Sequence, residues 1–300
     1  MRILITGGAG FIASHLTERF VIDGHHVAVL DNLTHGKRNR IPPQADFFQL
    51  DLASPEVDKV FRSFRPEVVY HHAAQIDVTA SLKQPLDDAR TNILGTLALL
   101  IHCRNHGVRK IVYASSAAVY GTPIYLPVDE LHPIKPLSLY GVSKHSPEHY
   151  IEAFAALYGM DYTILRYANV YGPRQDPLGE GGVISIFLDK IANGFPPVIY
   201  GDGLQTRDFI YVKDIVAANV AALTNGSKEI LNVSCNQATS ILVLLNRLES
   251  ATGAKLTPIY KPARPGDILH SVLNNNAAIK SLGWLPRFSI SEGLKDTLSG

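Results

Sequence analysis

Two serines followed by two alanines stand where an apolar run ends, in the stretch VYASSAAVYG at 112–121. Further along, Tyr140 and Lys144 are four residues apart, a spacing that brings both side chains to one face of a helix. A tyrosine with a pKa near 10 is a poor base at neutral pH, and a nearby ammonium group favours its phenolate. A decrease of about three pKa units corresponds to roughly 4 kcal/mol. The pair is therefore a candidate for acid–base chemistry if a dinucleotide site precedes it, beside the strand that ends in Ser115 and Ser116.

A glycine-rich segment, TGGAGFIA at 6–13, lies between the first apolar run and the first helical pattern. Gly8, Gly10 and Ala13 fit the pattern G-x-G-x-x-G/A. In that pattern a tight turn lets the backbone approach a pyrophosphate, which binds at the N-terminus of the following helix. The segment therefore predicts a dinucleotide site.

Acidic residues end the second and third apolar runs. Asp31 follows the glycine segment by about 20 residues, where a carboxylate accepts hydrogen bonds from a ribose and repels a 2′-phosphate. This position favours NAD, while Lys37 and Arg38 keep NADP as an alternative. Asp51 either reaches the adenine or caps a helix that begins in LASPEV.

The elements that position these residues are predicted from alternating patterns. Short apolar runs fall near 2–6, 26–31, 47–51, 67–74, 110–116 and 162–170, and helical patterns fall near 11–23, 55–64, 87–106 and 139–158. Strands that alternate with helices form right-handed βαβ units with a parallel sheet covered on both faces. We therefore predict the α/β class, with a doubly wound, Rossmann-type parallel sheet.

The second half of the chain no longer shows a regular alternation of strand and helix patterns. A Gly- and Pro-rich stretch at 171–182 predicts a loop, and a helical pattern follows near 183–193. The run RDFIYVKDIVAANVAAL predicts a strand that leads into a helix. We expect an NAD-binding domain over 1–168, to which 207–225 returns, and a smaller, interleaved C-terminal α/β substrate domain over 169–300.

Several segments together resemble the extended short-chain dehydrogenase/reductase family, and within it the UDP-glucose 4-epimerases. The resemblance extends over nearly the whole chain and rests on TGGAGFIA, the Asp31-Asn32-Leu33 strand end, HHAAQ, SSAAVYG, YGVSK and RYANVYGPRQ. It implies that Tyr140 is the acid/base, Lys144 its electrostatic partner and Ser116 the hydroxyl that bonds the reacting sugar oxygen. Ser115 is interpreted as a structural hydroxyl at the strand end.

The same resemblance implies which residues contact the cofactor and the substrate. The implied NAD contacts are Gly7, Gly10, Phe11, Ile12, Asp31, Asn32, Leu33, Asp51, Leu52, Ala73, Ala74, Gln75, Asn92 and Ala168. From the residues alone, Asn92 would be interpreted as a helix surface residue.

The implied substrate contacts lie in the second half of the chain. They are Asn169 for the diphosphate or sugar, Val183, Ile184, Val198 and Tyr200 for the uracil, Arg207 and Arg264 for the diphosphate, Asp267 for the uridine ribose and Ser271 for the sugar. The planar fork of arginine suits a diphosphate better than the point charge of lysine. A small residue such as Ser271 leaves room for a 2-acetamido group, which a tyrosine there would exclude.

Ala117 and Ala118 narrow the expected reaction. Family members that dehydrate nucleotide sugars carry an Asp-Glu pair at this point, and decarboxylases carry a glutamate at the second position. Alanine can neither protonate a leaving hydroxyl nor remove a carbon-bound proton. What remains supports reversible oxidation at one carbon.

The expected function is reversible 4-epimerisation of a UDP-hexose. The C4 hydride passes to bound NAD, the 4-ketose rotates, and the hydride returns to its other face. One alternative is a 4-epimerase of UDP-GlcNAc/UDP-GalNAc or of UDP-glucuronate. Others are an oxidoreductase that releases NADH and, in a different class, an NAD-binding redox-sensing regulator.

Composition and charge limit the partners. The formal net charge is +1 and 18% of residues are charged, so no nucleic-acid footprint is expected. There is no signal-peptide pattern and no apolar run near the roughly 20 residues that span a membrane. Only Cys103 and Cys235 occur, which favours a cytoplasmic location. By resemblance, the helices near 87–106 and 139–158 would form the four-helix bundle of a homodimer.

Twelve histidines invite the question of a metal site. The adjacent pairs His25-His26 and His71-His72 lie on predicted strands, where neighbours point to opposite faces, and no H-x-x-x-H spacing accompanies these pairs. We therefore expect no metal. Two departures from the family pattern are Ala13, in place of the third glycine, and Pro147, which is predicted to bend the helix that carries Lys144.

Overall fold

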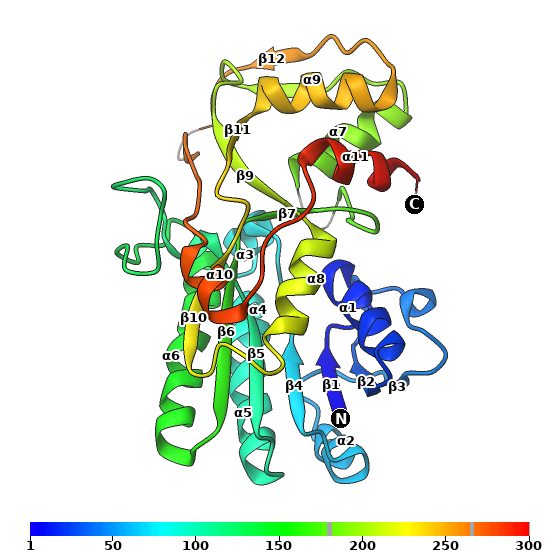
Figure 1. The fold of residues 1–300 in the computed structure, drawn as a ribbon, viewed down its shortest axis with the longest axis vertical. Coiled ribbons are helices and arrows are strands. Elements are labelled where there is room, and N and C mark those ends of the chain that lie inside the picture. The colour runs from blue at the N-terminus through cyan, green and yellow to red at the C-terminus, as the bar shows by residue number, and fades with distance from the viewer. Residues whose placement is uncertain (179–181, 265–266, 300) are drawn as a thin grey trace.

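The larger layer is a parallel sheet of seven strands in the order β10-β6-β5-β4-β1-β2-β3 (Figure 1). The computed structural model describes residues 1–178, 182–264 and 267–299. The strands are β1 (Arg2–Thr6), β2 (His26–Leu30), β3 (Asp46–Phe48), β4 (Val68–His71), β5 (Lys110–Ser116), β6 (Asp161–Tyr167) and β10 (Glu229–Val233). All their pairings are parallel, and the order changes direction between β1 and β4. The predicted doubly wound sheet is confirmed.

Successive side chains along each strand point to opposite faces of this sheet, and both faces are buried. Ile3 and Ile5 pack in one core with residues of α1 (Phe11–Ile22), α8 (Val212–Ala221) and α10 (Asn276–Leu282). Leu4 lies in the opposite core with residues of α2 (Val57–Phe64), α5 (Gly95–Asn105) and α6 (Leu139–Tyr158). This alternation is why the strands are almost continuously apolar.

The connections differ in places from the predicted elements. The single helix expected near 87–106 is divided into α4 (Pro85–Ala89), a π-helical turn (Arg90–Leu94) and α5, after a short α3 (Val78–Lys83). Short 3-10 turns cover Arg38–Arg40 and Ala117–Val119. The strand expected over 162–170 is divided as well, because β7 (Asn169–Tyr171) pairs in a different sheet from β6.

The smaller layer lies above the large sheet in Figure 1. It has a three-stranded sheet of β11 (Ala238–Ser240), β9 (Thr206–Tyr211) and β7, and a pair of β8 (Val198–Tyr200) with β12 (Ile259–Lys261). Its helices are α7 (Val183–Ala192), α9 (Ile241–Thr252) and α11 (Ile290–Ser299). Part of the loop predicted over 171–182, residues 179–181, lies outside the described residues.

The chain crosses between the two layers more than once. After β9, helix α8 returns to the larger layer, where the buried Tyr70 hydroxyl donates to the Asn219 carbonyl oxygen at 2.9 Å. Strand β10 then forms an edge of the large sheet. From the loop after β7, Arg174 donates to Ser14 at 3.0 Å and to Glu18 at 2.6 Å on α1. The layers are thus joined by chain crossings and by side chains.

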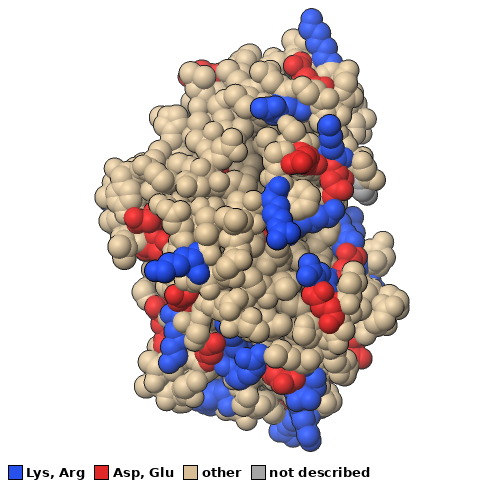
Figure 2. All heavy atoms as spheres, in the orientation of Figure 1, with Lys and Arg blue, Asp and Glu red and all other residues tan. Residues whose placement is uncertain are grey.

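Charged side chains of both signs lie on the face of the molecule that Figure 2 shows. Figure 2 shows basic and acidic side chains interspersed over the face in view, with uncharged surface between them. Among the described helices, none is both long and apolar enough to cross a bilayer.

Candidate active site

The glycine loop lies at the carboxyl end of β1, beside the loop that follows β4. Gly7 has a φ of 71°, and a Cβ on it would lie 2.6 Å from the Ala73 backbone nitrogen. A Cβ on Gly8 would lie 2.8 Å from both methyl groups of Val29. The loop therefore has no room for a side chain at Gly7 or Gly8, and it leads through Gly10 into α1. Ligands bind at such a switch point of strand order, where the first N–H groups of a helix lack partners within the helix.

Asp31 is held beside this loop at the end of β2. Its Oδ2 accepts a hydrogen bond from the Ala9 N–H at 3.0 Å, and its Oδ1 accepts from the Leu33 N–H at 2.8 Å. The Gly36 backbone closes over it, since a Cβ there would lie 2.9 Å from Oδ1. The carboxylate is thus fixed where the ribose of a dinucleotide on the glycine loop would meet it, and these residues fit NAD.

Asp51 and Asn32 lie together at the neighbouring strand ends. The Asn32 amide donates to Asp51 Oδ2 at 3.0 Å, and Asp51 Oδ1 accepts from the Ala53 N–H at 2.9 Å. Helix α2 begins only at Val57, so the alternative of Asp51 as its cap was wrong. The adjacent Leu52 is buried in the core.

Asn92 joins the loop after β4 to α6. Its Oδ1 accepts from the Gln75 N–H at 2.7 Å, and its amide donates to the Gln75 carbonyl and to the Ser143 hydroxyl, both at 2.9 Å. The side chain is 2% exposed, so the alternative of a helix surface residue was wrong. Contact of Asn92 with NAD stays a prediction, and the partner Ser143 had no signal in the sequence.

The turn after β5 and the first turn of α6 touch directly. A Cβ on Gly141 would lie 2.7 Å from the Ala118 carbonyl oxygen, so only glycine permits this approach. Ser138 caps the helix by accepting from the Gly141 N–H at 3.0 Å. Ser116 Oγ accepts from the Ala118 N–H at 3.2 Å. The structure therefore brings the segments that carry Ser116 and Tyr140 side by side.

Lys144 lies one turn further along α6 and is buried. Its Nζ is 4.6 Å from the centroid of the Tyr113 ring, and its carbonyl oxygen accepts from the Tyr113 hydroxyl at 3.2 Å. Burial lowers the pKa of Lys144 to about 7, and the charges of Glu148 and Asp88 oppose that decrease. The Lys144 amine therefore takes up and releases a proton near neutral pH.

Glu148, one turn beyond Lys144, was not recognised from the sequence. Its carboxylate accepts from the Ser115 hydroxyl at 2.6 Å and from Arg166 at 2.7 and 3.0 Å. Burial alone would raise the pKa of Glu148, but hydrogen bonds from His145, Arg166 and Ser115 lower it to about 2. Ser115 thus has a structural contact, as interpreted from the sequence. The i,i+4 spacing from Lys144 was the available signal.

Helix α6 continues through Pro147 from Leu139 to Tyr158. Pro147 therefore does not end the helix, and the bend stays a prediction; Lys144 is 4% exposed. Ala13, the other departure from the family pattern, is 2% exposed in the core that contains β1 and α1.

The predicted substrate residues gather at two places in the smaller layer. The Arg264 guanidinium lies 3.8 Å from the centroid of the Tyr200 ring, and its hydrogen bond lowers the pKa of Tyr200. Arg207 donates to the Thr206 carbonyl oxygen at 2.8 Å, and the same oxygen accepts from the Ser271 N–H at 3.2 Å. The structure therefore makes Arg207 and Ser271 neighbours.

Asp267 links these two places. Its N–H donates to the Arg264 carbonyl oxygen at 3.3 Å. Burial lowers the pKa of Arg207, and the charge of Asp267 opposes that decrease. Asn169 is exposed at the start of β7, and Ala168 before it is partly buried.

Two predicted contact residues have their side chains in the interior. Ile184 is 2% exposed and Phe11 is 4% exposed, and both belong to the core of the smaller layer. The Ile184 side chain packs in that core, and its contact with the uracil stays a prediction. Phe11 can offer a ligand only its backbone. Val183 and Val198 are partly buried.

The sequence of this chain is similar to those of known NAD-dependent epimerases. The family model described as the NAD dependent epimerase/dehydratase family matches residues 3–234. A UDP-glucose 4-epimerase of Mycolicibacterium smegmatis is 39% identical over 305 residues, which cover 99% of this chain and 97% of that protein.

Solved structures match over nearly the whole chain. A UDP-glucose 4-epimerase of Thermotoga maritima with UDP-glucose is 42% identical, with a TM-score of 0.97 over 100% of this chain and 98% of that one. The Thermus thermophilus UDP-glucose 4-epimerase with NAD is 41% identical, with a TM-score of 0.94 and the same coverage. A UDP-N-acetylglucosamine 4-epimerase of Methanobrevibacter ruminantium is 34% identical, with a TM-score of 0.94 over 99% and 97% of the two chains.

Similarity in sequence and structure thus covers the glycine loop, the large sheet and the smaller layer alike. The chain belongs to the NAD dependent epimerase/dehydratase family.

Proposed function

We propose that this chain is an NAD-dependent UDP-glucose 4-epimerase, which interconverts UDP-glucose and UDP-galactose. The observation that carries the proposal is the contact of the Ser116 turn with the Tyr140 turn through Gly141, beside a buried Lys144. Ala117 and Ala118 provide no acid for elimination. Relatives of nearly the same length with this activity in their names support it.

The glycine loop, the N-terminus of α1 and Asp31 would hold NAD, which supplies a hydride acceptor when bound. The Asp31 carboxylate disfavours the 2′-phosphate of NADP. Arg38 does not offset this, because its guanidinium lies 4.6 Å over the Phe47 ring.

The proton steps fall to three side chains. The Ser116 hydroxyl donates a hydrogen bond to the sugar O4, and Tyr140 takes the proton of the C4 hydroxyl. A protonated Lys144 favours the Tyr140 phenolate by charge. When the 4-keto sugar has turned over, Tyr140 returns the proton to O4. The same base thus serves both faces of the sugar.

The smaller layer would hold the nucleotide and leave the sugar free to turn. Arg207 and Arg264 bind the diphosphate, and Asp267 accepts from the uridine ribose. Tyr200 and Val198 flank the uracil. This division suits an epimerase, which must retain the nucleotide while the sugar changes its face.

Tyr140→Phe tests the mechanism. It removes the acid/base, so turnover of UDP-galactose in a coupled assay should fall by about 10² to 10⁴. Tyr158→Phe at the end of the same helix is the control, since Tyr158 is 50% exposed and should tolerate the change. Full activity in Tyr140→Phe would reject the mechanism. Retention of NAD by a wild-type protein that turns over no UDP-sugar would instead favour a regulator.

The second candidate function is 4-epimerisation of UDP-GlcNAc/UDP-GalNAc. Ser271 favours it, because a small side chain beside Arg207 leaves room for a 2-acetamido group. The solved UDP-N-acetylglucosamine 4-epimerase with a TM-score of 0.94 supports this candidate.

A second copy of the chain would cover an apolar face of α5 and α6. Ile101, Val142, Tyr150 and Leu157 are 38%, 45%, 41% and 72% exposed, which suits the four-helix bundle of a homodimer. A monomer mass by light scattering would contradict this assembly. Both cysteines are free thiols, as a cytoplasmic enzyme would have.

A further inference from the structure

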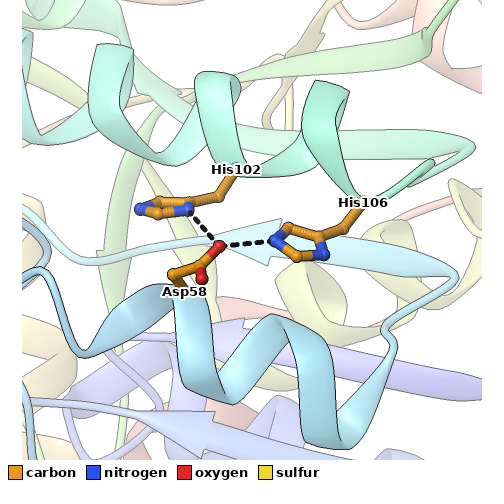
Figure 3. A group of neighbouring side chains, drawn as sticks. All are labelled: Asp58, His102 and His106. Atoms are coloured by element: carbon orange, nitrogen blue, oxygen red, sulfur yellow. Dashed lines mark hydrogen bonds and ion pairs between the residues drawn. The ribbon is translucent and has the colours of Figure 1, made fainter.

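His102 in the last turn of α5 and His106, which caps the C-terminus of that helix, face Asp58 of α2 (Figure 3). This end of α5 leads into the start of β5, whereas Ser116 lies at the other end of that strand. His106 Nε2 lies 2.7 Å from Asp58 Oδ1, and His102 Nδ1 lies 3.9 Å from the same oxygen. One ligand atom of each residue lies within 4.8 Å of the others. The expectation of no metal was drawn from strand histidines and left out this helical H-x-x-x-H pair.

An independent feature of His102 points to a ligand. Within the described part of the chain, its Nδ1 is shielded from solvent and has no hydrogen-bond partner. A buried polar atom without a partner costs free energy. Because Nδ1 is directed at Asp58 Oδ1, a cation between them would satisfy it (Figure 3).

Neighbouring side chains fix the orientation of all three groups. The Phe61 ring lies 5.5 Å from the His102 ring and 5.6 Å from the His106 ring, measured between centroids. Arg62 Nε is 2.7 Å from Asp58 Oδ2, which leaves Oδ1 directed toward the histidines. Such support reduces the cost of ordering ligands around an ion.

We propose that Asp58, His102 and His106 bind one Zn²⁺ ion, with water as the fourth ligand. Imidazole and carboxylate are ligands that Zn²⁺ accepts, at about 2.0–2.2 Å, so tetrahedral ligand atoms lie about 3.3 Å apart. The separations of 2.7 and 3.9 Å bracket that value. The side chains are 18% to 30% exposed, which lets the ion enter and keep a water. The ion would join α2 to α5 and stabilise the fold.

Zinc titration of tag-free, chelator-treated full-length protein tests the site, by calorimetry and by the shift in Tm. The wild type should bind one Zn²⁺ per chain and gain about 2 °C or more in Tm. His102→Ala and His106→Ala should each weaken binding at least about tenfold and abolish the Tm gain. Asp58→Asn, which retains the side-chain volume, is a second test if an alanine variant folds poorly in chelator.

The matched control is the other i,i+4 histidine pair of the chain. His145 and His149 lie on α6 with their Nε2 atoms 3.0 Å apart, and Glu148 beside them is bound to Arg166. His149→Ala should therefore bind zinc as the wild type does. Failure of the wild type to bind one equivalent, or wild-type binding by His102→Ala and His106→Ala, would overturn the proposal. So would loss of zinc binding in His149→Ala alone.

Discussion

The Ser115 hydroxyl donates a hydrogen bond to the Glu148 carboxylate across 2.6 Å in the protein interior. Strand β5, which ends in Ser116, is thereby joined to the helix that carries Tyr140 and Lys144. Arg166 on β6 donates to the same carboxylate. Glu148 is therefore a positioning residue, which holds three neighbouring elements around the predicted catalytic side chains.

Glu148→Gln should destabilise the protein by about 3–5 kcal/mol, because it leaves the buried Arg166 without its charge partner. The folded-state pKa of Glu148 is about 2, below the ordinary 4.5. Its stabilisation is therefore complete above pH 4.5 and is lost as the pH falls toward 2. Urea unfolding at pH 7 and pH 3 should show a larger difference from wild type at pH 7.

Glu152→Gln is the matched control for this experiment. Glu152 lies one turn further along α6, with its side chain 42% exposed, and should change the unfolding free energy by less than about 0.5 kcal/mol. An equal effect of Glu148→Gln at both pH values would show that its charge is not what stabilises the fold.

Gly7→Ala should abolish retention of NAD through gel filtration. The new Cβ would meet the Ala73 backbone nitrogen at 2.6 Å, in a backbone conformation with a φ of 71°. Gly24→Ala is the control that separates the steric clash from the strain of a positive φ. Gly24 has a φ of 79° and nothing within 4 Å of its Cβ position. It should cost only about 1–2 kcal/mol and retain NAD. Equal retention by both variants would contradict the assigned role of the loop.

Arg264→Lys should raise the KM for the UDP-sugar by about tenfold or more and leave kcat nearly unchanged. Lysine keeps the charge but loses the planar fork that binds a diphosphate and stacks on Tyr200. Steady-state kinetics measure both constants. Arg247→Lys on the exposed surface of α9 is the control, and it should alter neither. A fall in kcat alone would place Arg264 in the chemistry instead.

Ser271→Tyr should lower kcat/KM for UDP-GlcNAc at least about tenfold relative to UDP-galactose. The larger ring would fill the space beside Arg207 that a 2-acetamido group needs. Ser271→Ala, which stays small, should keep both activities. If the wild type turns over UDP-galactose and neither N-acetyl sugar, the interpretation of Ser271 is wrong.

Much of the larger layer could be predicted because its signals are local. Continuous apolar runs mark strands buried on both faces, and the glycine segment marks a tight turn with no room for a side chain at Gly7 or Gly8. The errors arose where tertiary contacts override local pattern. Residues 162–170 form one apolar run, yet β7 pairs with β9 in another sheet.

The sequence by itself determined the alternating strands and helices, the glycine loop and the i,i+4 pair of Tyr140 and Lys144, because each depends on residues close together in the chain. Only the tertiary structure decided that Gly141 touches Ala118, and that Glu148 binds Ser115 and Arg166. It also decided that Asp58 meets His102 and His106. These contacts join residues far apart in the sequence, and they form only when helices pack on a sheet whose strand order no local pattern encodes.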